Sequence, residues 1–158
     1  MQDEGYNCEW SQELTLHQSF DEYLNAWIII HILKDKLNIE SKDEPGFIFN
    51  MSAGYDFAGI MKDNVQHFSD KMIDASDELK QKTEELKEIY PNVVNLNINP
   101  QLTDNITLLT MHGCPPDEIE QIAEDLIRER NLNTTVKLNP TLLGKKELKA
   151  IIDNSGYI

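Results

Sequence analysis

Residues 110–120, with the sequence TMHGCPPDEIE, form the stretch that decides how this chain folds. The apolar run over residues 106–111 predicts a strand that ends just before His112 and Cys114. Pro116 predicts a helix immediately afterwards, because proline fits the first helical turn and the acidic residues behind it favour the positive end of the helix dipole. Loops at the carboxyl ends of parallel strands face the ligand crevice of α/β proteins. The stretch therefore predicts a strand, a loop with candidate chemistry and a helix.

Strand and helix patterns alternate on both sides of this stretch. The first helix is expected to begin at a capping box formed by Ser19 and Glu22, and to be deeply buried because Ile29 and Leu33 widen its apolar face. Residues 93–98 fit either a short strand or an extended linker. The other expected elements are strands over residues 47–52 and 134–138 and helices over residues 61–72, 79–89, 116–127 and 148–152.

The order of these elements predicts the fold class. Alternating strands and helices imply a parallel sheet with right-handed crossovers. A complete (β/α)₈ barrel takes about 250 residues, whereas this chain has 158. We therefore expect an α/β fold in the form of a partial TIM barrel, in which residues 1–158 make a single domain excised from a larger barrel domain.

Composition limits the classes of function. The chain has 28 acidic and 14 basic residues and a net charge of −14, which repels nucleic-acid phosphates and anionic membrane surfaces. No apolar run reaches the roughly 20 residues that span a bilayer, and the first residues lack the pattern of a signal peptide. We therefore expect a cytoplasmic protein that binds neither nucleic acid nor membranes. Cys8 and Cys114 form no CxxC pair and the histidines are scattered, so no metal site is expected.

Polar side chains occur at three junctions where an expected strand meets its loop. Lys137 lies between apolar neighbours on a strand that is expected to be largely buried, so its ammonium group needs an acceptor. That acceptor is either part of a ligand (a phosphate, a flavin ring or a substrate carboxylate) or a neighbouring carboxylate of the protein, and spacing favours neither. The three sets of polar residues are Asn50, Ser52 and Tyr55; His112 and Cys114; and Lys137 and Asn139.

The residues of the central loop have alternative interpretations as well. A helix that begins just after Cys114 would lower the pKa of its thiol, which suits a nucleophile or a proton donor. Composition alone favours the alternative of a small buried residue that shapes a turn. His112 fits an acid–base group, and it fits a capping or core histidine equally well.

Four stretches of the chain resemble one known family: residues 3–14 (DEGYNCEWSQEL), 49–56 (FNMSAGYD), 110–120 and 136–144 (VKLNPTLLG). They look like the corresponding stretches of the family named "putative selenate reductase subunit", a group of large bacterial oxidoreductases, and the resemblance spans nearly the whole chain. The N-terminal part of that family is similar to the FMN-type barrel of dihydropyrimidine and dihydroorotate dehydrogenases. The resemblance therefore implies a piece of the barrel domain of an oxidoreductase subunit.

The resemblance also implies roles for the site residues. Lys137, with Pro140 three residues further on, matches a Lys-x-x-Pro strand whose lysine contacts the flavin in the barrel dehydrogenases. Cys114 and Pro115 match the end of an Asn-x-Ser-Cys-Pro motif whose residues face flavin and substrate, although residues 111–113 replace its Asn-x-Ser part. The implied catalytic residues are Cys114 and His112, and the implied FMN-binding residues are Lys137, Asn139, Asn50 and Ser52.

Cofactors and partners outside this chain are implied too. Members of the family carry iron–sulfur motifs and an FAD- and NAD(P)H-binding module further along the polypeptide. The expected partners are therefore the remainder of that polypeptide and its redox subunits, and the isolated fragment is expected to be inactive.

Two rival hypotheses stand beside this one. The replaced Asn-x-Ser part fits a degenerate barrel that does no redox chemistry and serves subunit interaction or small-ligand binding. A small free-standing α/β binding protein is the third hypothesis, and the abrupt end at Tyr157 and Ile158 argues against it.

Overall fold

The computed structural model describes residues 4–7, 14–39, 46–109, 115–137 and 143–154 of the chain. Strands and helices alternate along it. The strands are β1 (Glu4–Asn7), β2 (Phe47–Ala53), β3 (Asn105–Leu109) and β4 (Asn133–Lys137). The helices are α1 (Leu16–Lys36), α2 (Phe57–Ile60), α3 (Asp63–Ile73), α4 (Ser76–Leu86), α5 (Pro116–Glu124) and α6 (Gly144–Asn154), with a 3₁₀ turn η1 (Pro91–Asn95) and a π-helical turn η2 (Asp125–Glu129).

The described strands form one parallel sheet in the order β1-β2-β3-β4. Each strand therefore pairs with its neighbour in sequence, and helices occupy the connections between them, as in consecutive βα units. The predicted α/β fold with parallel strands is confirmed. The sequence patterns missed β1, because its residues Glu-Gly-Tyr-Asn contain no apolar run.

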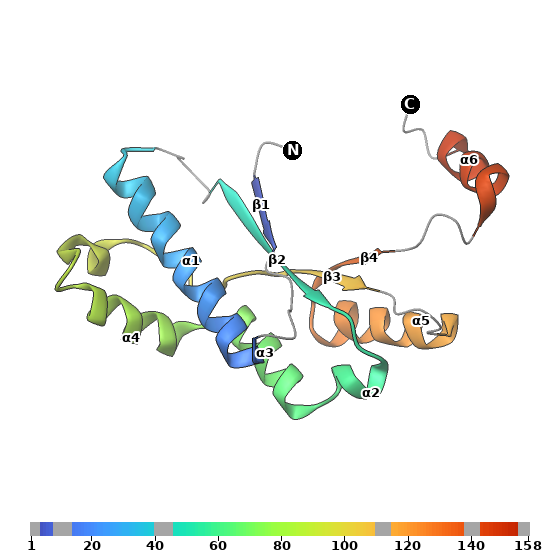
Figure 1. Cartoon of the computed structure of the whole chain (residues 1–158), viewed down its shortest axis with the longest axis horizontal. Coiled ribbons are helices and arrows are strands. Elements are labelled where there is room, and N and C mark those ends of the chain that lie inside the picture. Colours follow the sequence, from blue (N-terminus) through green and yellow to red (C-terminus); the bar gives the residue numbers. More distant parts are fainter. Residues whose placement is uncertain (1–3, 8–13, 40–45, 110–114, 138–142, 155–158) are drawn as a thin grey trace.

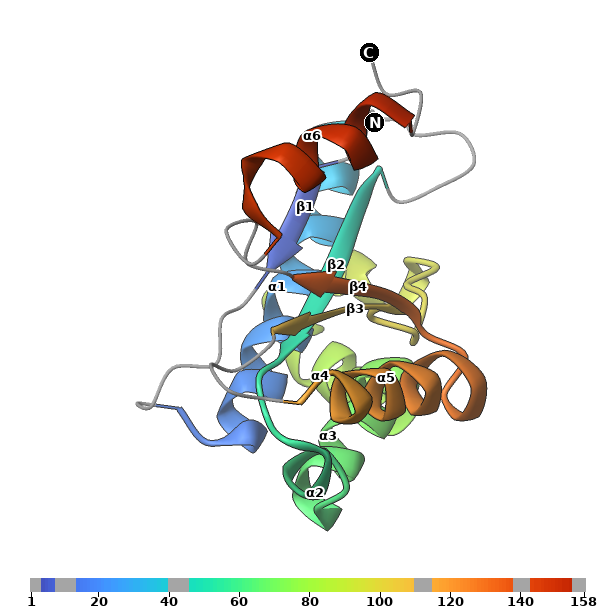
Figure 2. The same ribbon diagram turned by 90° about the vertical axis from the view of Figure 1, so that its right-hand side faces the viewer.

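The sheet has two different faces, because successive side chains of a strand point to opposite sides. In β2, Phe47, Phe49 and Met51 are buried, whereas Ile48 and Asn50 are half buried. The buried set packs with helical residues in one hydrophobic core, which defines the helix-covered face, and Figures 1 and 2 show α1, α3 and α5 on one side of the sheet. The open face is the opposite side, which by alternation and register carries Ile48, Asn50, Ser52, Asn105, Thr107, Leu109, Asn133, Thr135 and Lys137.

Within the described ranges, no helix packs on the open face (Figure 1). Parallel sheets are usually covered on both faces, because helical crossovers lie over them. In a (β/α) barrel the helices all lie outside, and the other face of the sheet points toward the barrel axis. The described sheet therefore has the form of one wall of such a barrel.

An aromatic cluster attaches α1 to the sheet. The Trp27 ring lies against Phe47 and Phe49, with centroid distances of 4.8 and 4.9 Å and edge-on geometry. Its indole Nε1 donates a hydrogen bond to the Asn99 carbonyl at 2.9 Å. Aromatic pairs in this geometry add stabilisation beyond the area that they bury. The helix is therefore fixed both by packing and by one partly buried hydrogen bond.

The start and the depth of α1 differ from the prediction. The capping box is made by Thr15 and Gln18, where the Thr15 hydroxyl accepts from the Gln18 backbone N–H at 3.3 Å and the Gln18 side-chain oxygen Oε1 accepts from the Thr15 backbone N–H at 2.9 Å. Ser19 is instead a buried residue inside the helix. The expected deep burial is wrong for Ile29 and Leu33, which are 52% and 47% exposed, because only one side of α1 contacts the sheet.

The segment between α4 and β3 is the second difference. Residues 93–98 form no strand: the first of them belong to η1, which begins at Pro91, and α4 already ends at Leu86. Thr103 then closes this connection, because its buried hydroxyl donates to the Phe49 carbonyl and accepts from the Asn105 backbone N–H at 2.9 Å. The connection is therefore tied to both β2 and β3.

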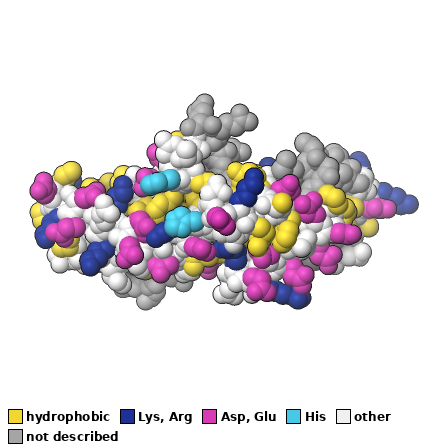
Figure 3. All heavy atoms as spheres, turned by 90° about the horizontal axis from the view of Figure 1, so that it is seen from below, with side chains coloured by type: hydrophobic (Ala, Val, Ile, Leu, Met, Phe, Trp, Pro, Cys, Tyr) yellow, Lys and Arg dark blue, Asp and Glu magenta, His cyan; other side chains and the backbone are white. Residues whose placement is uncertain are grey.

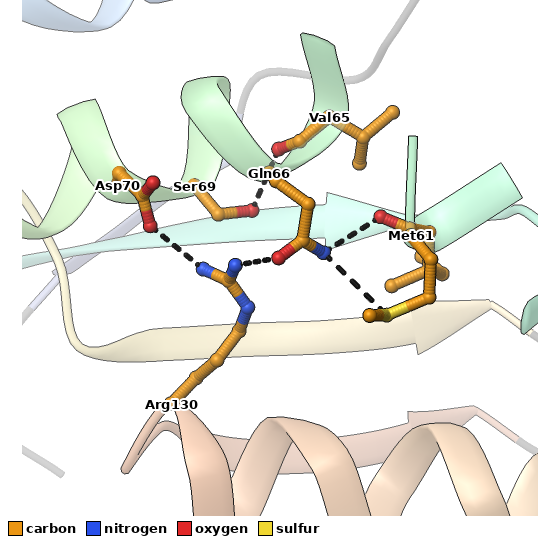
Figure 4. A network of polar contacts seen from close by, with 7 residues as sticks. Met61, Val65, Gln66, Ser69, Asp70 and Arg130 are labelled. Carbon is orange, nitrogen blue, oxygen red and sulfur yellow. Dashed lines mark hydrogen bonds and ion pairs between the residues drawn. The ribbon is translucent and has the colours of Figure 1, made fainter. Parts of the chain in front are cut away.

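Arg130, just after η2, links the α5 unit to α3 (Figure 4). Its guanidinium donates to the Asp70 carboxylate at 3.0 Å and to the Gln66 side-chain oxygen. The Gln66 amide nitrogen in turn donates to the Ile60 carbonyl at 2.8 Å. Two successive βα units are therefore held together by side-chain hydrogen bonds as well as by the sheet.

Helix α6 lies apart from the other helices in Figure 1 and contains no buried residue. Its apolar residues Ile151 and Ile152 are 55% and 43% exposed. Of the helices in the described ranges, none is long and apolar enough to cross a membrane.

Candidate functional site

Polar side chains from neighbouring strands gather on the open face. The strand register pairs Ser52 with Thr107 and Thr107 with Thr135, so these side chains form one row across β2, β3 and β4. Lys137 pairs with Leu109 at the carboxyl end of the same face. Strands β2, β3 and β4 contain no Asp or Glu, and Lys137 is their single charged residue. In a chain of net charge −14, this face is locally neutral to positive and suits groups that accept hydrogen bonds or carry negative charge.

Asn50 and Thr107 are joined directly across the open face. The Asn50 side-chain nitrogen donates to the Thr107 hydroxyl oxygen at 2.8 Å. On the other side of β2, the Tyr23 hydroxyl donates to the Asn50 backbone carbonyl at 3.2 Å. Both the backbone and the side chain of Asn50 are therefore held by neighbours, which fixes the orientation of its amide group.

The position of Lys137 differs from the prediction. Its strand was expected to be largely buried, but β4 alternates between exposed and half-buried positions, and Lys137 is exposed. The reason is that β4 is the outer strand of the described sheet, so its open-face residues have a described neighbouring strand on one side only. The ammonium group therefore lies at an accessible edge of the face, where it can meet a ligand.

The structure brings together part of the predicted site. Asn50, Ser52 and Lys137 share the open face, with Ser52 buried and Asn50 half buried. His112, Cys114 and Asn139 lie outside the described residues. The last described residues of β3 and β4, Leu109 and Lys137, are register neighbours, so the two strands end side by side.

Contacts beyond the carboxyl ends of the strands fix the loop after β2. Asp56 caps α2 by accepting from the Gly59 N–H at 2.7 Å. Glu118, in the first turn of α5, accepts from the Phe57 N–H at 3.0 Å. A Cβ atom on Gly59 would lie 2.8 Å from the Asp56 carboxylate and 2.8 Å from Tyr55 Cβ, so this position requires glycine. The junctions after β2 and before α5 are therefore joined to each other.

A cavity of about 490 Å³ lies elsewhere, between α1, α3 and α4. Its charged lining residues are paired: Lys71 lies 2.6 Å from Glu78, and Lys82 lies 3.8 Å from Asp21. The hydrogen bond to Glu78 raises the pKa of Lys71. Figure 3 shows the molecule from below, with acidic, basic and apolar side chains interspersed. The cavity is built from helices only, so it is separate from the open face.

His31 is a titratable group on the helix-covered side. It lies edge-on to Trp27 and Phe47, and its burial, together with the nearby Lys34 charge, lowers its pKa to about 4. The imidazole is therefore neutral at physiological pH and belongs to the aromatic packing. Among the described residues, no group of three His, Cys, Asp or Glu side chains could hold a metal ion.

Thr107 is a candidate site residue that the sequence analysis did not single out. Its signal was present, because it alternates with buried apolar neighbours along β3. Period-two alternation places it on the same face as Asn50 and Lys137 once the register is known. Threonine is common in strands because of its β-propensity, so without the register its presence in a strand does not indicate a site residue.

A parallel sheet of consecutive βα units with its described helices on one face is the arrangement of the (β/α) barrel class. The chain belongs to the family described as "Oxidoreductase YgfK, N-terminal TIM-barrel domain", whose model matches residues 1–158. The predicted partial TIM barrel is thereby confirmed.

Two curated relatives carry the name "Putative oxidoreductase YgfK", one from Escherichia coli K12 and one from Escherichia coli O157:H7. Each is 40% identical to this chain over 175 aligned residues, which cover 99% of the chain and 17% of the relative. The chain therefore spans 17% of the length of the curated relatives that it matches. No solved structure matches the chain. The expected oxidoreductase family is confirmed, and the narrower assignment to selenate reductase stays a prediction.

Proposed function

We propose that this domain contributes the FMN-facing wall of a flavin-type oxidoreductase subunit. The observation that carries the proposal is the open face, which presents amide and hydroxyl groups with one cation and no carboxylate on β2, β3 and β4. The family name and the resemblance to barrel dehydrogenases support the same assignment.

The residues present fit an FMN molecule. A flavin offers ring carbonyls and ring nitrogens that need donors and acceptors, and its phosphate and reduced ring carry negative charge. Lys137 would supply the opposing charge, and Asn50 and Ser52 would bond the polar edge of the ring. Bound FMN would supply two-electron redox chemistry at this face. The protein's own contribution is to orient that group and to provide charge that needs no reorganisation.

The loop residues complete the proposed site. We assign His112 and Cys114 to the substrate side, with Cys114 as a proton donor or nucleophile, and Asn139 to the flavin side. This assignment rests on the family resemblance and on the adjacency of the ends of β3 and β4.

The whole protein is proposed to pass electrons between this barrel and further cofactors. FAD, NAD(P)H and iron–sulfur clusters would be held by the remainder of the polypeptide or by redox subunits, because the chain spans only 17% of its relatives. Among activities, the resemblance supports electron transfer similar to that of dihydropyrimidine dehydrogenase. Selenate reduction is the narrower alternative for the intact protein.

The test uses the full-length protein that carries this domain, purified as wild type, Lys137→Ala and Lys146→Ala. Lys146 is an exposed lysine of α6, so its variant removes the same charge away from the open face. After acid release, FMN and FAD are separated by chromatography and counted per polypeptide. We expect Lys137→Ala to lose FMN selectively while Lys146→Ala retains it. Equal FMN content in all three proteins, or no FMN in any, would remove the flavin site from this domain.

The replaced Asn-x-Ser part supports one alternative, a degenerate barrel for subunit interaction or small-ligand binding. This alternative predicts that full-length protein with Cys114→Ala and Lys137→Ala together keeps normal turnover with its electron donor. A large fall in turnover, with the folded state intact by circular dichroism, would exclude it.

A further inference from the structure

We propose that Thr107 is a positioning residue that turns the Asn50 amide so that its carbonyl oxygen accepts a hydrogen bond from a ring N–H of the flavin. The inference rests on the proposed function, because it assigns one polar contact within that same site. It names both the atom that recognises the ligand and the residue that orients it.

Asn50 and Thr107 lie on the same face of the sheet, within hydrogen-bonding distance of each other. Ser52 is the register partner of Thr107, so Asn50, two residues earlier on the same face, lies diagonal to Thr107. Diagonal neighbours on one face are within reach of each other's side chains. The observed contact is a hydrogen bond of 2.8 Å from Asn50 Nδ2 to Thr107 Oγ1. A one-residue change in register would move Asn50 to the other face, so the pair also depends on the pairing of β2 with β3.

The second step is the hydrogen-bonding capacity that remains. An asparagine amide has donors on its nitrogen and acceptor lone pairs on its oxygen. Because Thr107 engages the nitrogen, the oxygen is directed away from Thr107. In the part of the chain that the structure describes, the bond to Thr107 is the hydrogen bond of the Asn50 side chain, and Oδ1 receives none. Because the bond to Thr107 fixes the orientation of Oδ1 in advance, a ligand with a matching donor gains affinity here.

The third step is the chemical class of the group that fits. Lys137 provides a donor and a positive charge on this face. An added acceptor at Asn50 therefore gives the face a mixed pattern of donors and acceptors. A heterocyclic imide, which presents an N–H between two carbonyl groups, matches that pattern, and a flavin ring contains one. A phosphate alone, which has acceptors only, would gain nothing from Asn50 Oδ1.

The test compares variants that differ in one hydroxyl group. Thr107→Val removes the hydroxyl with little change in shape, and Thr107→Ser retains it. Thr135→Val is the matched control, because Thr135 is the register partner of Thr107 on the same face and is exposed. Full-length protein is stripped of flavin and titrated with FMN, and binding is followed by the quenching of flavin fluorescence. The absorption spectrum of the bound flavin is recorded as a second readout.

We expect Thr107→Val to weaken FMN binding about tenfold, since a lost hydrogen bond of this kind corresponds to roughly one decade in Kd. Its bound-flavin spectrum should shift, because the contact at the ring N–H is disturbed. Thr107→Ser and Thr135→Val should bind FMN like the wild type. Wild-type affinity in Thr107→Val, or an equal loss in Thr107→Ser, would overturn the inference.

Lys137→Ala separates the failure of this inference from the failure of the proposed function. If Lys137→Ala weakens FMN binding while Thr107→Val does not, the flavin site stands and the positioning role is wrong. If neither variant changes FMN binding, the proposed function fails and the inference fails with it.

Discussion

Side chains of neighbouring residues in β2 point to opposite faces of the sheet. Phe49 and Met51 are each 1% exposed and pack under the helices, while Asn50 between them turns to the open face and bonds Thr107. The helix-covered face is apolar and closed, so it contributes stability through burial. The open face is polar, so replacing its side chains should change binding far more than folding. Under the proposed function, alternate residues of β2 therefore serve folding on one face and ligand binding on the other.

The substitution Phe49→Ala is expected to cause the largest loss of stability, and it tests the difference between the two faces. Phe49 is buried against Tyr23 and Trp27, with ring centroids 5.8 and 4.9 Å away. Removal of a buried phenyl ring leaves a cavity and costs about 3–5 kcal/mol. Urea unfolding of the 158-residue chain, followed by tryptophan fluorescence, measures the change. The control is Thr135→Ala on the open face, which is expected to change stability by no more than about 0.5 kcal/mol. Similar losses in the two variants would contradict the division between the faces.

Thr103→Val is expected to have the next largest effect. The hydroxyl of Thr103 is buried and bonds the Phe49 carbonyl and the Asn105 N–H, so valine would leave two backbone groups of β2 and β3 without that partner. An unsatisfied buried polar group costs about 1–3 kcal/mol. Thr103→Ser keeps the hydroxyl and should recover most of the loss. If serine destabilises the chain as much as valine does, the methyl group rather than the hydroxyl is responsible.

The parts of the fold that could be predicted from sequence are those with local sequence signals. β2, β3 and α5 were predictable because their signals are local: a short apolar run bounded by turn residues, and proline with acids at a helix start. β1 was not, because it is a strand through pairing with β2 rather than through its own composition. The start of α1 was misplaced because Ser19-Glu22 and Thr15-Gln18 both match a capping box, and local sequence does not decide between them.

The candidate site was predictable in its residue types but not in its arrangement. Asn50, Ser52 and Lys137 could be chosen because polar residues at strand ends stand out against apolar runs. Thr107 could not, because its importance lies in a bond to Asn50, 57 residues away in sequence. The exposure of Lys137 also depends on which strands flank β4, and its own sequence neighbours gave the opposite expectation.

The pH dependence of stability tests the ion pair between Lys71 and Glu78, which lines the cavity between α1, α3 and α4. Partial burial raises the pKa of Glu78, but hydrogen bonding and the charge of Lys71 outweigh it, so the pKa of Glu78 lies below its ordinary value of 4.5. The pKa of Lys71 is raised above 10.5 by the same hydrogen bond. The pair therefore stabilises the fold fully between these two ordinary values. Its contribution is lost as pH falls through the lowered pKa of Glu78, or as pH rises through the raised pKa of Lys71.

Glu78→Gln measures that contribution directly. The pair is partly exposed, so the loss at pH 7 should be at most about 1 kcal/mol. The difference between Glu78→Gln and the wild type should shrink to zero below the lowered pKa of Glu78, as measured by urea unfolding at a series of pH values. A difference that persists at acid pH would show that the substitution acts through packing and not through charge.

Asp70→Asn is expected to have the smallest effect, although Asp70 belongs to the network that links α3 to Arg130. The Asp70 side chain is 65% exposed, whereas that of Arg130 is 14% exposed and also bonds Gln66. An exposed ion pair contributes about 0.2–1 kcal/mol, and asparagine keeps one acceptor, so the loss should be near the lower end. Arg130→Ala should cost more, because it removes the packed stem and both hydrogen bonds. Urea unfolding at low and high salt separates the two variants. The small loss of stability in Asp70→Asn should vanish at 1 M salt, where screening acts over about 3 Å. The loss of stability in Arg130→Ala should remain. Equal losses that salt abolishes in both variants would mean that charge alone, rather than the buried stem of Arg130, joins the two units.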